Sequence, residues 1–114
     1  MTTKKVIPRY LAIRDVDEII NHYLETKSEA IALGFVDALE SAYARIGSNP
    51  ALGSLRYAYE LDLPGLRTWP LKRYPYLIFY VQRDDHLDVW RVLHGSRDVP
   101  RWMHEQDESE SSES

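Results

Sequence analysis

One run of residues constrains the fold more than any other: Tyr76 to Val81 reads YLIFYV and contains no charged residue. A strand built from this run is apolar on both faces, as expected for a central strand that helices cover. The polar stretch from Arg83 to His86 follows, and Leu87 to Leu93 then resumes β-prone sequence. These segments predict an antiparallel β-hairpin whose strands are both at least partly buried.

Shorter segments predict the remaining strands. Leu66 to Trp69 is expected to form an edge or bulged strand, because Pro70 has no N–H to donate to a neighbouring strand. The pair Pro64-Gly65 before it is typical of a turn. Val6 and Ile7 are candidates for one more short strand at the beginning of the chain.

A first amphipathic helix is predicted over about residues 10–25, because an apolar stripe runs from Val16 to Leu24 at helical spacing. Asp15 and Glu18 are a candidate capping pair near its start. Pro8 is an alternative beginning one turn earlier, since proline is favoured at the first helical position.

A second helix is predicted directly after the first. Ser28 is its expected N-cap, and its apolar stripe runs from Ala32 to Ile46. Three stop signals follow this stripe, namely Gly47, Asn49 and Pro50. Because so few residues separate them, the two helices are expected to form a tight hairpin. Residues 51–65, which follow, carry no helical stripe.

The chain length of 114 residues fits one domain, because a second core would leave each half too small to fold alone. We place this domain at residues 1–104. The Ser- and Glu-rich segment 105–114 is expected to be disordered, since it has too little apolar surface to offset its chain entropy.

The charge of the chain is unevenly distributed. The formal net charge is −4, but residues 105–114 hold five acids and no base, which leaves 14 bases and 13 acids in residues 1–104. A body so close to neutrality argues against bulk binding of nucleic acid, which depends on a conspicuous basic face. We expect no direct sequence-specific binding of nucleic acid, while a local basic patch remains open.

Several classes of site are disfavoured by what the sequence lacks. It contains no cysteine, which excludes disulfides and thiolate chemistry, and no Gly-rich phosphate loop. Its four histidines show no metal-ligand spacing, so we expect neither a metal nor another cofactor. No apolar stretch approaches the ~20 residues of a membrane span, so a cytoplasmic protein without membrane contact is the expectation.

Basic and polar residues gather where the last predicted strand ends. Five of them lie within eleven residues, namely Arg91, His94, Arg97, Asp98 and Arg101, and Trp102 and Met103 follow directly. Guanidinium groups, an imidazole and an aromatic anchor suit the recognition of a protein surface or a phosphate. The plainer alternative is a structural loop in which Arg97 pairs with Asp98 and His94 donates to a carbonyl.

Several strings of this sequence resemble the ParE branch of the ParE/RelE toxin superfamily. In chain order they are Ala12 with Asp15, Glu18, Ile19 and Tyr23; Phe35 with Leu39-Glu40, Ile46, Asn49-Pro50 and Gly53; Leu66-Arg67; YLIFY at 76–80; and RVLHGSRDVP at 91–100. The resemblance covers about residues 5–102, and its most specific string is the last one.

The resemblance implies an α+β fold in which an N-terminal two-helix hairpin packs on a small curved antiparallel sheet of three to four strands. It also implies the toxin of a type II toxin–antitoxin system that arrests growth by binding DNA gyrase, and a cognate ParD-like antitoxin that neutralises it. On this interpretation there are no catalytic residues. The target-binding residues are expected to be Arg91, His94, Arg97, Arg101 and Trp102.

The antitoxin is expected to bind near Trp69, which stands beside Pro70 on the short edge strand. A partner segment would there add a strand or lay a helix in a groove. Apolar residues of the helical hairpin are candidates to extend this surface, namely Ile20, Leu24 and Leu33. Leu33 is alternatively a plain surface leucine.

The nuclease branch of the superfamily offers an alternative function, an endoribonuclease of the RelE type that cleaves mRNA. The candidate residues are Glu60 as base, Arg67 or Arg73 as phosphate clamp, and His94 as acid. That branch tends to carry an arginine immediately before the apolar central strand, where this chain has Pro75-Tyr76. A third interpretation is an inactive member that retains only the fold.

Overall fold

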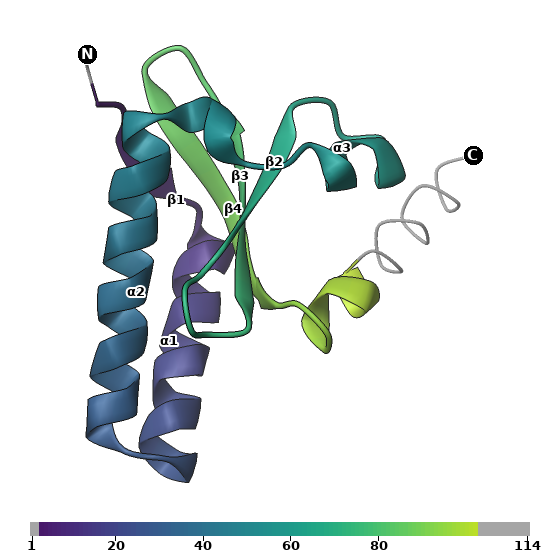
Figure 1. Ribbon diagram of the computed structural model, residues 1–114. Helices are drawn as coiled ribbons and strands as arrows, with labels where there is room; N and C mark the ends of the chain where they lie inside the picture. The colour runs from purple at the N-terminus through teal and green to yellow at the C-terminus, as the bar shows by residue number, and fades with distance from the viewer. Residues whose placement is uncertain (1–2, 103–114) are drawn as a thin grey trace.

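The computed structural model describes residues 3–102, which form one four-stranded sheet with helices on both faces (Figure 1). The elements in chain order are β1 (Lys5–Pro8), α1 (Tyr10–Thr26), α2 (Glu29–Ser48), the 3₁₀ turn η1 (Pro50–Leu52), α3 (Arg56–Glu60), β2 (Leu66–Pro70), β3 (Tyr76–Gln82) and β4 (His86–His94). Residues 98–102 add a further helical turn. The segment 105–114, for which we expected disorder, lies outside the described residues.

The strand order is β1-β4-β3-β2, with β3 antiparallel to both β2 and β4. The predicted α+β architecture, the hairpin and the edge position of β2 are therefore confirmed. The sheet is mixed rather than purely antiparallel, because β1 runs parallel to β4. These two strands are separated by every other element, so no tight turn forces them into opposite directions.

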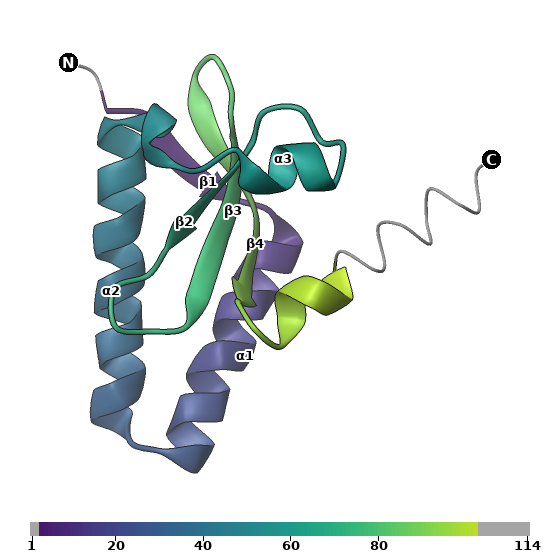
Figure 2. The same ribbon diagram turned by 45° about the vertical axis from the view of Figure 1, so that its right-hand side comes forward.

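The central strand β3 is apolar on both faces, as the sequence predicted, because each face meets a separate core. Tyr76, Ile78 and Tyr80 pack with residues of the α1–α2 hairpin. The alternating set that includes Phe79 and Val81 packs with residues of α3 and the turn at 98–102. Figure 1 and Figure 2 show the hairpin on one side of the sheet and α3 with the last helical turn on the other.

A β-bulge resets which side chains of β4 face the hairpin. Phe79 pairs with Arg91 while Tyr80 pairs with Val89, which leaves Trp90 as the extra residue of β4. Val89 before the bulge and Val92 after it consequently belong to the same core, on the hairpin side. Trp90 packs instead with the core on the other face. No turn residue marks the bulge in the sequence, so it was not predicted.

The predicted first helix is confirmed, but the capping pair of Asp15 and Glu18 is wrong. Helix α1 begins at Tyr10 and has no side-chain hydrogen bond at its N-cap. Asp15 lies more than a turn inside it and accepts from Arg91 Nε at 2.8 Å, from the second Arg91 nitrogen at 2.9 Å and from the Val92 backbone N–H at 3.0 Å. Glu18 faces outward and forms a loose ion pair with Arg14.

The role of Asp15 follows from the short length of β1. This strand ends at Pro8, opposite Val89, so the second half of β4 has no neighbouring strand on that side. The carboxylate of Asp15 occupies part of this vacant edge and satisfies the Val92 N–H, which would otherwise be buried without a partner. One side chain thereby fastens α1 to the sheet.

The second helix matches its prediction closely. Ser28 is the N-cap, and its hydroxyl accepts from the Ile31 N–H at 3.1 Å. The turn before β2 is also confirmed, because Gly65 has a φ of 85°, a conformation that glycine adopts without strain. Residues 51–65 nevertheless contain η1 and α3, which the sequence did not predict. A helix of five residues is too short to show a periodic stripe.

The outer edge of β2 is closed to a further strand. Thr68 and Ser54 exchange backbone hydrogen bonds of 2.9 Å in both directions, and the Leu66 N–H donates to the Leu63 carbonyl at 3.1 Å. Pro70, the next residue whose backbone points outward, has no N–H. This arrangement protects the sheet from edge pairing and disfavours the expected addition of a partner strand here.

We predict that Asp15→Asn lowers the free energy of unfolding by about 2 kcal/mol, because it weakens two bonds to a partly buried guanidinium. Urea denaturation monitored by circular dichroism measures the change. Asp17→Asn, an exposed position on the same helix, is the matched control and should change stability by no more than about 0.5 kcal/mol. Equal losses in the two variants would contradict the role assigned to Asp15.

Candidate functional site

The five residues expected to bind the target do not all lie on the surface. Arg97 and Arg101 are exposed. The side chain of Arg91 is only 22% exposed, since Asp15 holds it against α1. Trp102 is 5% exposed, and its ring meets that of Phe79 edge-on at 4.8 Å. The expectation of Trp102 as an exposed anchor is therefore wrong: the turn at 98–102 folds back and buries it against β3.

His94, at the end of β4, organises the loop that follows. Its Nδ1 accepts from the backbone N–H groups of Ser96 at 3.2 Å and Arg97 at 3.1 Å. Its own backbone N–H donates to the Asp98 carboxylate at 3.1 Å. Among residues 3–102, Arg97 and Asp98 form no ion pair with each other. Neither bond of the plainer interpretation is therefore present in this part of the chain, since His94 accepts rather than donates. The loop is instead organised by the bonds of His94.

This geometry favours the neutral ring of His94. Burial of the ring and the charge of Arg97 lower the pKa of His94, against the opposing effect of Asp98. Because Nδ1 is an acceptor, the neutral ring carries its proton on Nε2. An imidazolium would place a second proton on Nδ1, against two N–H groups that already point at it. A neutral imidazole N–H is too weak an acid for general acid catalysis, so His94 is a poor candidate for that role.

The other residues considered for a nuclease are dispersed. Glu60, on α3, pairs with Arg56 at 3.5 Å. Arg67, on β2, donates to the backbone carbonyls of residues 51 and 53. Arg73 lies in the turn between β2 and β3 with a φ of 71°. Within residues 3–102, no hydrogen bond or ion pair joins any two of the four nuclease candidates, and no group of three or more His, Asp or Glu side chains is placed to hold a metal ion.

A groove of about 850 Å³ lies between α2 and the strand β2 with its following turn. Small side chains of α2 form one wall, and Trp69 and Tyr74 form part of the other. The lining residues are Gly34, Asp37, Ala38, Ser41, Ala42, Arg45, Trp69, Pro70, Lys72, Arg73 and Tyr74. Three of these are cationic and one is anionic, so the groove is suited to an acidic partner.

The groove depends on a close contact between its two walls. The Tyr74 hydroxyl donates to the Ile31 carbonyl at 2.9 Å, and a Cβ at position 34 would collide with that hydroxyl. Gly34 therefore allows the tyrosine to lie against α2.

The four antitoxin-binding candidates are spread over different places, and only Trp69 lines the groove. Leu33, which precedes Gly34, is 57% exposed, and Leu24, on α1, is 49% exposed. Ile20 packs against the core of the hairpin side.

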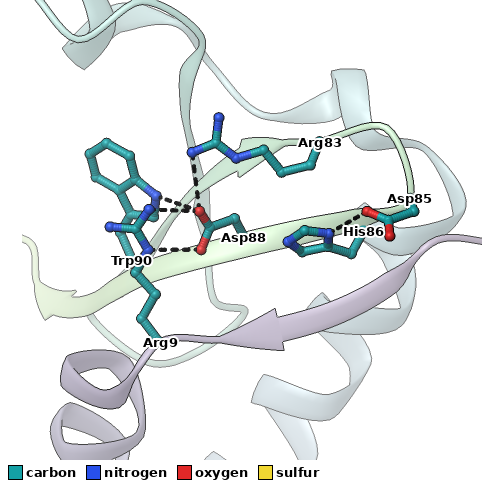
Figure 3. Close-up of polar contacts among 6 residues, drawn as sticks. All are labelled: Arg9, Arg83, Asp85, His86, Asp88 and Trp90. Atoms are coloured by element: carbon teal, nitrogen blue, oxygen red, sulfur yellow. Dashed lines mark hydrogen bonds and ion pairs between the residues drawn. The ribbon is translucent and has the colours of Figure 1, made fainter.

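A buried carboxylate, which the sequence did not indicate, joins the first strand and helix to the sheet. Asp88, on β4, is 8% exposed and accepts from two nitrogens of Arg9 at 2.9 and 2.8 Å (Figure 3). It also accepts from Arg83 at 3.2 Å and from Trp90 Nε1 at 3.1 Å. The Arg9 guanidinium lies over the Trp90 ring, 4.6 Å from its centroid. An aspartate inside an otherwise apolar strand is the signal that would have found this cluster.

A second, smaller hollow adjoins this cluster near the first residues of α1. It is lined by Arg9, Tyr10, Leu11, Trp90, Arg91 and Trp102. Both of its arginines are held by carboxylates, Arg9 by Asp88 and Arg91 by Asp15. Their charges are therefore largely matched within the fold.

The helical hairpin on a mixed sheet, followed by a basic loop after the last strand, defines a small α+β protein of the RelE/ParE-like fold. The model of a protein family, described as the ParE toxin of the type II toxin–antitoxin system parDE, matches residues 6–99. The chain therefore belongs to the ParE toxin family. This confirms the resemblance drawn from the sequence.

Solved structures support the same fold. One of them, described as a chromosomal ParDE toxin–antitoxin system from P. aeruginosa, is 20% identical, with a TM-score of 0.67. The match covers 81% of this chain and 96% of that one. No curated protein gives a significant sequence match. None of the helices in residues 3–102 is both long and apolar enough to cross a membrane.

We predict that Asp88→Asn destabilises the fold at neutral pH by about 1–2 kcal/mol, and that the difference from wild type narrows in acid. Burial raises the pKa of Asp88, but the hydrogen bonds from Arg9, Trp90 and Arg83 together have the larger, opposite effect. The pKa of Asp88 is therefore below its ordinary value. The carboxylate therefore stabilises the fold above the unfolded pKa of about 4, and this contribution is lost as the pH falls through the folded value.

Denaturation of both proteins at pH 7 and at pH 3 measures this difference. Asp84→Asn, in the exposed turn before β4, is the control and should follow the wild type at both pH values. A gap between Asp88→Asn and wild type that stays constant with pH would rule out the ionised carboxylate as its cause.

Proposed function

We propose that this ParE-family toxin inhibits DNA gyrase by binding it in the cytoplasm, without catalysis, and that a ParD-like antitoxin neutralises it. The family match supports gyrase as the target. The observation that favours binding over catalysis is the position of the His94 ring. Its Nδ1 is occupied by two backbone N–H groups, so the best candidate for a general acid is not equipped to transfer a proton.

The target-binding surface that we propose is the loop and helical turn at 94–102. Arg97 and Arg101 are its exposed cations. Guanidinium groups bind carboxylates or phosphates through paired hydrogen bonds, so two of them can fix the orientation of the toxin on its target. Arg91 and Trp102 support this surface without standing on it. Arg91 is bonded to Asp15, and Trp102 packs in the core.

The antitoxin is proposed to occupy the groove between α2 and β2. The closed edge of β2 disfavours an added strand, and the groove offers the aromatic surface of Trp69 beside Arg45, Lys72 and Arg73. A segment that places apolar side chains against Trp69 and carboxylates against these cations fits that surface.

An assay with supercoiled plasmid and gyrase tests the proposed target. Toxin bound to gyrase is expected to hinder religation, so linear DNA accumulates, while primer extension on a parallel translation reaction shows no new mRNA ends. Replacing both Arg97 and Arg101 with alanine should raise the toxin concentration required at least about tenfold, the factor equivalent to 1.4 kcal/mol of lost charge-assisted contacts.

Arg56→Ala, an exposed arginine on α3, is the matched control and should retain full effect. Cut mRNA together with unchanged gyrase activity would replace this proposal with the endoribonuclease. Expression without growth arrest and without either activity would indicate the inactive member.

Trp69→Ala is predicted to weaken the complex with the antitoxin by about tenfold or more, because an aromatic anchor is removed from the groove. Titration calorimetry with the purified antitoxin measures the dissociation constant. Tyr59→Ala removes a highly exposed aromatic ring on α3 and should leave it unchanged. Equal affinity of wild type and Trp69→Ala would place the antitoxin elsewhere.

A further inference from the structure

The loop after β4 is held by bonds to a single residue. The His94 ring accepts from the backbone of Ser96 and Arg97, and the His94 backbone donates to Asp98, where the last helical turn begins. The hydroxyl of Ser96 also lies 3.3 Å from Nδ1. Removal of the ring would leave two backbone N–H groups of this loop without the acceptor that the fold provides.

The ring of His94 is itself fixed by the sheet. It meets the buried ring of Tyr76 edge-on, with centroids 5.4 Å apart, and Tyr76 pairs with His94 across β3 and β4. The next residue, Gly95, donates its N–H to the Pro75 carbonyl at 2.9 Å. The position of Nδ1 is therefore set by β3, and the backbone of Arg97 takes its position from Nδ1.

We propose that His94 is the positioning residue of the target-binding surface: its neutral ring, as acceptor of the Ser96 and Arg97 N–H groups, holds Arg97 and the turn at 98–102 in the binding arrangement, and protonation of Nδ1 releases them. This inference rests on the proposed function only in one respect, namely that this surface is the one that binds the target. The positioning itself is a property of the toxin alone.

The charged and titratable groups around the ring favour its neutral form at ordinary pH. From the loop, Arg97 opposes a second positive charge, and from the helical turn, Asp98 favours one. From β3 comes Tyr76, whose ring also meets that of Tyr23 on α1 edge-on, with centroids 6.3 Å apart; burial and Tyr76 raise the pKa of Tyr23 to about 12, so this phenol stays uncharged. The bonds of Nδ1 are therefore retained above the ordinary histidine pKa of about 6.5 and lost as the pH falls below it.

Amide hydrogen exchange of the free toxin tests the positioning directly. In His94→Leu, which has no acceptor, the Ser96 and Arg97 amides should exchange about tenfold faster than in wild type, the factor expected for one net hydrogen bond of 1.4 kcal/mol. In His94→Asn the side-chain oxygen can accept from the amides two and three residues on, so protection should be largely restored. Unchanged exchange in His94→Leu would overturn the proposal.

A pH series on the wild type needs no substitution and covers the case in which His94→Leu fails to fold. After correction for the intrinsic rates, protection of the two amides should decrease in wild type as the pH is lowered below the ordinary histidine pKa of about 6.5, and it should stay constant in His94→Asn. Nitrogen-15 NMR of the ring should show the proton on Nε2 at pH 7.5. A proton on Nδ1, or equal pH responses in the two proteins, would contradict the proposal.

Gyrase binding by the same variants separates this proposal from the proposed function. If the loop amides lose protection in His94→Leu and gyrase affinity falls at least about tenfold relative to His94→Asn, both stand. If the amides lose protection but affinity is unchanged, His94 still positions the loop, and the loop is not the gyrase contact. If affinity falls while the amides stay protected, the positioning role is excluded.

Discussion

The structure depends on how the fold satisfies the outer edge of β4, because a neighbouring strand pairs with only half of that edge. Strand β1 is four residues long and ends opposite Val89, whereas β4 continues to His94. The carboxylate of Asp15 covers part of the remaining edge by binding the Val92 N–H and the Arg91 guanidinium together. Because Asp15 belongs to α1, the same contact joins the helical hairpin to the sheet. The C-terminal half of β4, after which the loop begins, is therefore bonded both to α1, through Asp15, and to β3.

The two binding surfaces that we propose lie on this arrangement of helices and sheet. With 14 bases and 13 acids in residues 1–104, the body has little net charge, and several arginines are already matched by Asp15 and Asp88. Recognition by such a protein relies on a few oriented groups rather than on a broad electrostatic field. Arg97 and Arg101 stand after β4, and Arg45, Lys72 and Arg73 stand in the groove beside α2. The cations of the loop and those of the groove come from different elements, which suits the two binding partners that we propose.

Local features could be predicted from the sequence, and long-range pairings could not. The two-faced strand at Tyr76 to Val81 and the cap at Ser28 rest on neighbouring residues, so the pattern alone indicated them. The sequence suggests a capping role for Asp15, and it cannot show the actual partner, Arg91, which lies 76 positions away. The bulge at Trp90 and the burial of Trp102 likewise depend on how distant segments pack. For the candidate site, the sequence indicated a segment that stays a prediction, and it could not show which side chains of that segment face outward.

We propose that the loop after β4 contacts gyrase and breaks no bond. Photo-crosslinking with a photoreactive amino acid in place of the exposed Ser96 tests this contact, and the same replacement of Tyr59, which is exposed on α3, is the control. When each protein is mixed with gyrase and ribosomes, a covalent adduct with a gyrase subunit is expected from position 96 and none from position 59. Adducts with ribosomal components from position 96, and none with gyrase, would contradict it.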